Sequence, residues 1–152
     1  MKCANVMTTE IFCCLPGDSL EEVASVMQSE DIGPVPIVDD LETRNLLGIV
    51  TDRDIALRAV ARGLDTRKTT AEEVMTRELV TCGVEDEIES ALDLMARHQV
   101  RRLPIVDGES RLVGMISQAD VATRLNESDK IAEVVEEISR PSTDSAVEPR
   151  FR

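Results

Sequence analysis

The sequence predicts an α/β protein built from two copies of a strand–helix–strand–strand–helix motif. Three observations lead to this fold class: an internal repeat, apolar residues at helical spacing in each copy, and short β-branched runs divided by polar turns. One copy of about 60 residues would bury too little apolar surface to be stable alone. We therefore expect the two motifs to pack about a pseudo-two-fold axis, each with a small mixed sheet.

The repeat rests on three segments that occur twice in the 152 residues. They are Val-Met-Thr at 6–8 and 74–76, Pro-Ile-Val-Asp at 36–39 and 104–107, and Gly-Ile-Val-Thr at 48–51 against Gly-Met-Ile-Ser at 114–117. The spacing drops from 68 to 66 residues across a polar turn, where chains tolerate changes of length. The predicted organisation is a first motif at 1–68, a second motif at 69–126, and a C-terminal helix with a polar tail at 127–152.

The same order of elements is expected in both motifs. In the first it is a strand at 11–15, a helix from the capping box of Ser19 and Glu22, strands at 35–38 and 46–50, and a helix from Thr51. In the second it is a strand at 79–82, a helix carrying Ile88, Ala91, Leu92 and Met95, strands at 103–106 and 112–116, and a helix from Ser117. In the tail, apolar residues at helical spacing predict an amphipathic helix at 130–139.

Composition argues against two classes of partner. The 30 acidic and 17 basic residues give a net charge of −13, which opposes binding to nucleic acid and to anionic membranes. There is no Trp or Tyr and only two Phe, so single-stranded nucleic acid would find no stacking platform. No apolar run approaches the ~20 residues of a membrane-spanning helix, and the first residues lack the apolar stretch of a signal peptide. We therefore expect a cytoplasmic protein that binds neither nucleic acid nor membrane.

The strongest chemical pattern is a hydroxyl residue followed three positions later by aspartate, at the point where a strand gives way to a helix. It occurs as Thr51 with Asp54 and as Ser117 with Asp120. The hydroxyl can cap the helix, whose free N–H groups favour an anion, and the carboxylate can accept hydrogen bonds from a ribose diol. A single copy would be explained equally well as an ordinary capping box. Two copies inside a matched repeat favour a binding function.

These doubled segments resemble a tandem pair of cystathionine β-synthase (CBS) domains, also called a Bateman module, over about residues 5–126. The stand-alone bacterial CBS pairs of the hypoxic-response type are the most similar kind. The resemblance implies a regulatory module that binds an adenosine ligand, namely AMP, ADP, ATP or S-adenosylmethionine, in clefts between the motifs. It also implies a homodimer, a signal passed to an unknown effector protein, and no required cofactor.

The resemblance carries roles to particular residues. Asp54 and Asp120 would hold ribose hydroxyls, while Thr51 and Ser117 would cap their helices and touch phosphate. The remaining expected ligand contacts line the adenine slots or meet phosphate: Cys14, Val35, Pro36, Leu103 and Pro104 for the slots, and Arg53, Arg101 and Arg102 for phosphate.

The two motifs differ in charge at these positions. Arg101 and Arg102 align with the uncharged Gly33 and Pro34, whereas Arg53 aligns with Ala119. Because arginine is the natural bidentate partner of phosphate, we hypothesise that the two clefts are unequal and that the second is the better phosphate site. The alternative is that these arginines pair with surface carboxylates.

The rest of the sequence supports no enzyme. It holds no Gly-rich phosphate loop and no nucleophile–base arrangement that this fold would bring together, and no local spacing predicts a metal site. We expect Cys14 and Cys82 to be half-buried thiols, and the single histidine, His98, to be a surface or capping residue at a helix end. The competing hypothesis is a thiol- or zinc-responsive interaction protein on the same scaffold, without nucleotide binding.

Overall fold

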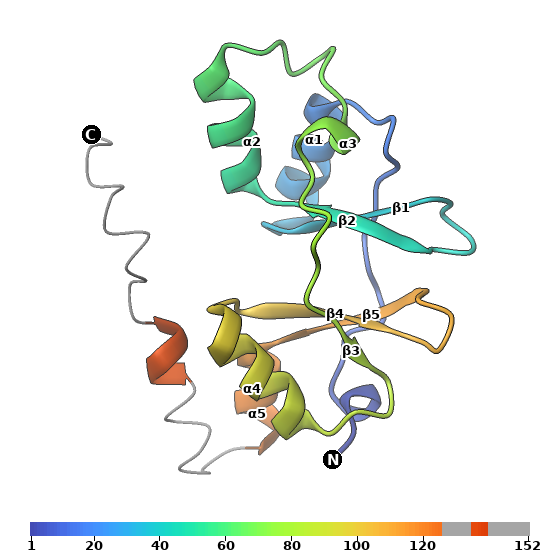
Figure 1. Cartoon of the computed structure of the whole chain (residues 1–152), viewed down its shortest axis with the longest axis vertical. Helices are drawn as coiled ribbons and strands as arrows, with labels where there is room; N and C mark the ends of the chain where they lie inside the picture. The colour runs from blue at the N-terminus through green and yellow to red at the C-terminus, as the bar shows by residue number, and fades with distance from the viewer. Residues whose placement is uncertain (126–134, 140–152) are drawn as a thin grey trace. The chain divides into compact units, whose positions relative to one another are not determined.

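The structure is a computed structural model that describes residues 1–125 and 135–139 (Figure 1). It divides into two compact units. The α1 unit comprises Glu10–Leu79 and Val106–Val113, and the α4 unit comprises Met1–Thr9, Val80–Ile105 and the described residues from Gly114 onward. Both units are mixed α/β with small sheets, which confirms the predicted fold class.

The α1 unit is a β-hairpin with its helices on one side (Figure 1). Strand β1 pairs antiparallel with β2, so that Val35 lies opposite Val50. Its core consists of aliphatic side chains, methionines and the Cys14 thiol, as the near absence of aromatic residues requires. The elements are α1 (Leu20–Glu30), β1 (Val35–Val38), β2 (Leu46–Val50), α2 (Asp52–Arg58), η2 (Val60–Arg62) and α3 (Ala71–Val74).

The α4 unit follows the same plan around a three-stranded sheet with the order β3–β4–β5. Helix α4 buries the four apolar residues whose spacing predicted it: Ile88, Ala91, Leu92 and Met95. The elements are η1 (Cys3–Asn5), β3 (Cys82–Gly83), α4 (Ile88–His98), β4 (Arg102–Val106), β5 (Leu112–Ser117) and α5 (Gln118–Leu125). The last residue of β4, the first two of β5 and the turn between them belong to the α1 unit.

The Val-Met-Thr segments complete each unit by crossing a strand at its glycine. In the α1 unit, Thr76 forms an antiparallel bridge with Ile49, and the Met75 side chain lies over Gly48. In the α4 unit, Thr8 bridges Met115 while Met7 lies over Gly114. The segment from the start of the second motif thus packs in the unit of the first, and the segment at the chain's start packs in the unit of the second. The repeat boundaries at 1–68 and 69–126 remain a sequence-based prediction.

Strands 35–38 and 46–50 and the capping box at Ser19 are confirmed, but the strand at 11–15 is wrong. Only Cys14 pairs there, through a single parallel bridge to Ile37. Pro16 has no N–H to extend the pairing, and the chain turns at once, with the Leu15 N–H donating to the Asp18 carboxylate at 2.8 Å. The strand at 79–82 likewise shrinks to the two residues of β3.

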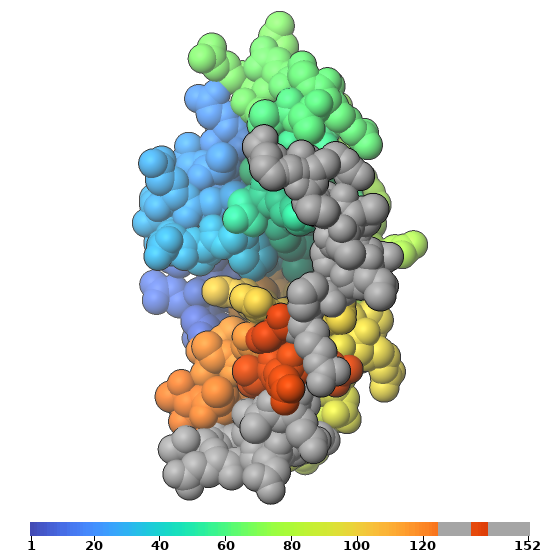
Figure 2. Space-filling view, turned by 90° about the vertical axis from the view of Figure 1, so that its left-hand side faces the viewer, coloured from blue at the N-terminus to red at the C-terminus, as the bar shows by residue number. Residues whose placement is uncertain are grey.

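Part of the predicted tail helix is described. Residues 135–139 are helical with Ile138 buried, and Figure 2 shows this turn at the surface of the α4 unit. The rest of the helix at 130–139, including Ile131 and Val134, lies outside the described residues. Among helices that the structure describes, none combines the length and apolar character that crossing a bilayer requires.

Replacing Gly48 by alanine tests the crossing in the α1 unit. The added Cβ would lie 2.8 Å from the Thr76 carbonyl oxygen and 2.7 Å from the Met75 sulfur. Because a backbone atom cannot move aside cheaply, we expect Gly48→Ala to lower the free energy of unfolding by about 1–3 kcal/mol in urea denaturation. The control is Gly17→Ala, where nothing lies within 4 Å of the added atom. Equal stability of the two variants would contradict the close approach.

Candidate functional site

In the α1 unit, the strand-to-helix junction is closed by reciprocal hydrogen bonds. The Asp54 N–H donates to Thr51 Oγ1 at 3.1 Å, and the Thr51 N–H donates to Asp54 Oδ2 at 2.9 Å. The other carboxylate oxygen, Oδ1, lies 3.7 Å from the Nε atom of Arg58. Both Thr51 and Asp54 are half-buried. The capping box is therefore real, and it uses only one of the two carboxylate oxygens.

The α4 unit repeats this geometry with one difference. The Asp120 N–H donates to Ser117 Oγ at 3.0 Å, and the Ser117 N–H donates to Asp120 Oδ2 at 3.2 Å. Within the described residues, Asp120 Oδ1 has no partner corresponding to Arg58. Helix capping and ribose binding, the two alternatives for this pattern, are therefore compatible, because the cap leaves a carboxylate oxygen available to accept further hydrogen bonds.

The predicted slot residues lie beside these junctions within each unit. The Cys14 N–H donates to the Pro36 carbonyl at 3.0 Å, and Val35 lies opposite the residue that precedes Thr51. In the α4 unit, Leu103 and Pro104 lie on the central strand of the sheet, next to the strand that ends at Ser117. All five slot side chains are buried. We call the first group with Thr51, Arg53 and Asp54 the Thr51 site, and the second with Arg101, Arg102, Ser117 and Asp120 the Ser117 site.

The arginines of the two sites differ in their surroundings. Arg101 and Arg102 are exposed, and neither guanidinium forms an ion pair or hydrogen bond with any residue in 1–125 or 135–139. Arg53 is also exposed and does interact with a neighbour. The alternative that Arg101 and Arg102 pair with surface carboxylates finds no support among the described residues. The Arg101 carbonyl oxygen accepts a hydrogen bond of 2.9 Å from the Gln118 N–H, which places its backbone at the start of α5.

The structure adds two arginines that the sequence analysis missed. Arg58 and Arg124 follow Asp54 and Asp120 by one helical turn, and each holds the segment that contains or precedes a Val-Met-Thr triplet. Arg58 Nη1 donates to the Val74 carbonyl at 3.0 Å, and Arg124 Nη1 donates to the Asn5 carbonyl at 3.4 Å. The same offset of 66 residues relates them, so the repeat itself was the signal that could have found them.

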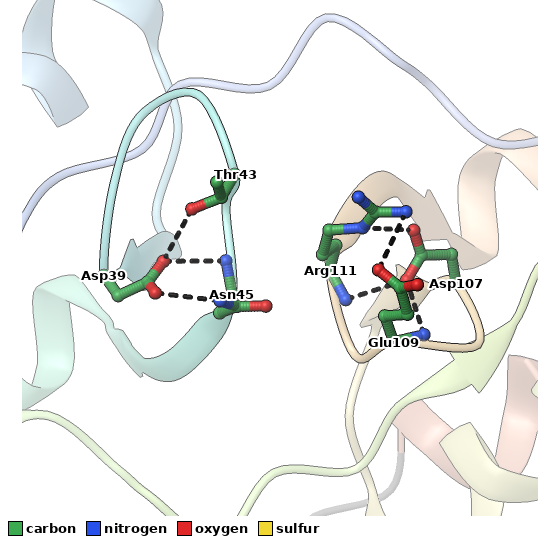
Figure 3. A network of polar contacts seen from close by, with 6 residues as sticks. All are labelled: Asp39, Thr43, Asn45, Asp107, Glu109 and Arg111. Carbon is green, nitrogen blue, oxygen red and sulfur yellow. Dashed lines mark hydrogen bonds and ion pairs between the residues drawn. The ribbon is translucent and has the colours of Figure 1, made fainter.

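The aspartates of the doubled Pro-Ile-Val-Asp segments close hairpin turns (Figure 3). The Asp39 carboxylate accepts hydrogen bonds from the Asn45 side chain at 2.8 Å and the Asn45 N–H at 2.9 Å, and these lower the pKa of Asp39. The Asp107 carboxylate accepts from the Arg111 N–H at 3.0 Å and the Arg111 Nε at 2.8 Å. The Arg111 backbone is the main cause that lowers the pKa of Asp107. This repeated motif is therefore structural.

The cysteines are more buried than the sequence suggested. Cys14 and Cys82 are almost fully buried rather than half-buried, because each packs into the core of its unit. Burial raises the pKa of the Cys14 thiol to about 11, so the free thiol is protonated at neutral pH. Cys82 lies within hydrogen-bonding reach of Cys3, which lowers the pKa of Cys3 and raises that of Cys82.

His98 is the last residue of α4 and is exposed, in accord with the surface interpretation. In the parts of the chain that the structure describes, no group of three or more His, Cys, Asp or Glu side chains is arranged to hold a metal ion.

Comparison with known proteins places this geometry in a family. The CBS domain model matches residues 3–60 and 71–127, so the chain belongs to the CBS domain family and carries two copies of the domain. It is 39% identical over 135 residues to the CBS domain-containing protein YhcV of Bacillus subtilis, covering 89% of this chain and 93% of that protein. It is 35% identical over 137 residues to hypoxic response protein 1 of Mycobacterium tuberculosis, covering 90% and 93%.

Two solved structures that share the fold hold ligands. Hypoxic Response Protein I, with two coordinated zinc ions, superposes with a TM-score of 0.73 at 34% identity, covering 81% of this chain and 98% of that one. The CBS domain pair of MJ0100, in complex with 5′-methylthioadenosine and S-adenosyl-L-methionine, gives 0.70 at 26% identity, covering 82% and 95%. The two similar folds thus accompany two different kinds of ligand.

The Asp107 turn predicts a pH-dependent contribution to stability. Since the pKa of Asp107 is lower in the folded protein than its ordinary value of 3.8, its contribution is complete above that value and is lost as pH falls through the folded pKa. We expect Asp107→Asn to destabilise the protein in urea denaturation at pH 7, with a difference from wild type that shrinks below pH 3.8. Glu109→Gln, at the more exposed partner of Arg111, serves as control. A deficit that is independent of pH would contradict the assignment.

Proposed function

We propose that this CBS pair is a regulatory sensor that binds an adenosine ligand (AMP, ADP, ATP or S-adenosylmethionine) at the Thr51 and Ser117 sites and signals to a partner protein. The observation that carries the proposal is a half-buried carboxylate that occurs in both units. In each unit it uses one oxygen in the cap and lies beside a slot of aliphatic side chains and backbone. The MJ0100 complex supports the adenosine class of ligand. On this proposal the protein binds and does not catalyse, and it needs no cofactor.

The assignment of carboxylates to ribose follows from their remaining hydrogen-bonding capacity. Asp120 Oδ1 and the spare lone pairs of Oδ2 can accept the two hydroxyl hydrogens of a ribose diol while the cap stays intact. Adenine would lie against Val35, Pro36, Leu103 and Pro104, because the chain has no Trp or Tyr to stack on it.

Phosphate recognition is proposed to be unequal between the sites. With a net charge of −13, the protein as a whole repels a polyphosphate, so phosphate affinity must come from a few local cations. Arg101 and Arg102 supply these at the Ser117 site, because both are exposed and their guanidiniums form no ion pair or hydrogen bond with the described residues. Arg53 supplies one cation at the Thr51 site.

We expect the double variant Arg101→Ala/Arg102→Ala to weaken AMP and ATP binding roughly tenfold in isothermal titration calorimetry, since each hydrogen bond to a charged group contributes about 1.5–3 kcal/mol and exposure reduces this. Adenosine binding should be nearly unchanged. The control removes two other exposed arginines, Arg62→Ala/Arg77→Ala, with the same change in net charge. An equal loss for adenosine and ATP would refute the role in phosphate binding.

Asp120→Asn separates the cap from ribose binding. Asparagine keeps one oxygen to accept the Ser117 N–H but replaces the other oxygen by a donor, so the helix should persist in far-ultraviolet circular dichroism. Adenosine and AMP should both bind more weakly, whereas 2′-deoxyadenosine should lose less. If all three ligands bind as to wild type, the carboxylate does not hold ribose.

A second candidate function is a zinc- or thiol-responsive interaction protein, favoured by the two zinc ions of Hypoxic Response Protein I. A thermal-shift series with AMP, ADP, ATP, S-adenosylmethionine and ZnCl₂ distinguishes the two. A ligand at 100 times its Kd adds about 2.7 kcal/mol of stability. Stabilisation by zinc alone, abolished by Cys→Ser variants, would replace the adenosine proposal.

We further propose a cytoplasmic homodimer that acts on an effector protein. The four cysteines are free thiols, as a reducing compartment would keep them.

A further inference from the structure

We propose that Asp52 is a specificity-determining residue, which makes the Thr51 site select neutral or cationic adenosine derivatives and disfavour those that carry phosphate. This inference rests on the proposed function. It concerns the position directly after the capping hydroxyl, which is Asp52 in the first motif and Gln118 in the second. Neither residue makes the capping hydrogen bonds, so the cap alone gives neither of them a role in ligand choice.

The first step is the position of the Asp52 carboxylate. Its Oδ1 atom lies 3.5 Å from the point that a Cβ atom on Gly33 would occupy, and it accepts the Arg53 N–H at 3.0 Å. Gly33 is the residue that aligns with Arg101. In the α1 unit, the Asp52 carboxylate therefore lies next to the backbone of Gly33. In the α4 unit, the aligned backbone position bears the Arg101 side chain.

The second step is the matching place in the α4 unit. There the Gln118 N–H donates to the Arg101 carbonyl at 2.9 Å, so the same two positions are again neighbours. The Gln118 side chain is neutral, and its Oε1 atom is buried with no hydrogen-bond partner among the described residues. At the aligned positions, a neutral amide and two arginines replace a carboxylate, a glycine and a proline.

The third step is the sum of local charges. At the aligned positions, the Thr51 site has two carboxylates, Asp52 and Asp54, and one guanidinium, Arg53. The Ser117 site has one carboxylate, Asp120, and two guanidiniums, Arg101 and Arg102. Two further charges occur in both units and so do not separate the sites: Arg58 matches Arg124, and Asp18 matches Asp86.

Asp52 is the carboxylate of the Thr51 site whose removal changes charge without disturbing the cap. Thr51 and Asp54 make the reciprocal hydrogen bonds, and Asp52 takes no part in them. Its carboxylate is exposed, so its field is screened by salt. A unit charge about 6 Å from a phosphate at the protein surface changes affinity roughly threefold to tenfold.

The test is calorimetric titration of the full chain and its Asp52→Asn variant with adenosine, AMP and S-adenosylmethionine. Asparagine keeps an oxygen to accept the Arg53 N–H. At the weaker AMP site, the variant should bind AMP threefold to tenfold more tightly, with adenosine unchanged. S-adenosylmethionine carries a sulfonium cation, so its affinity should fall. Both changes should shrink at high salt.

The matched control is Glu42→Gln, which removes one exposed carboxylate from the turn at the other end of the β1–β2 hairpin. Equal effects of the two variants on AMP would show a general charge effect and overturn the proposal, as would an Asp52→Asn variant that binds all three ligands like wild type. If the wild-type chain binds no adenosine ligand at all, the proposed function fails first, and this result is distinct from the other two.

Discussion

Both candidate sites depend on one interaction, the exchange of hydrogen bonds between a hydroxyl residue at the end of a strand and an aspartate in the first turn of the next helix. In each unit the carboxylate Oδ2 accepts the N–H of the hydroxyl residue, and the hydroxyl accepts the N–H of the aspartate. This fixes the helix start next to the sheet edge. Because the cap uses one carboxylate oxygen, it also fixes the position of the other, which a ligand can then meet without ordering the side chain. On the proposed function, one aspartate in each unit would both complete the cap and hold ribose.

The sequence predicted most of the elements that surround these caps, because periodicity and turn residues are local signals. β1 and β2 have their expected bounds, and α4 buries the expected residues. The predictions that failed concern features set by distant contacts or by a single residue. Pairing at Cys14 stops after one bridge because Pro16 follows, and α3 was not predicted, although Thr70 and Glu73 form a capping box.

The packing of the Val-Met-Thr segments could not have been predicted from local pattern. Each segment packs in the compact unit of the other motif, and only the tertiary structure shows which strand glycine it crosses. The same holds for Arg58 and Arg124, whose guanidiniums bind carbonyls at distant positions in the chain. The roles of the site residues in binding a ligand stay predictions, although the structure brings each group together within its own unit.

The two sites share a backbone plan and differ in charge, which is the pattern expected if one duplicated motif has come to bind two classes of ligand. The cap, the hairpin aspartates and the arginine that follows the cap are the same in both copies. Next to the caps, the two copies differ in charge at four aligned positions: Gly33, Pro34, Asp52 and Arg53 against Arg101, Arg102, Gln118 and Ala119. Shared residues build the fold, and the residues that differ set the local potential.

The most direct test is the stoichiometry of the wild-type protein. Calorimetric titrations with adenosine and with AMP, on the same preparation and at low salt, count the sites and compare their affinities. The account predicts two adenosine sites per chain of similar affinity, and two AMP sites whose affinities differ at least roughly tenfold, as two units of local charge imply. Two AMP sites of equal affinity would contradict unequal phosphate recognition, and binding of neither ligand would contradict the adenosine assignment itself.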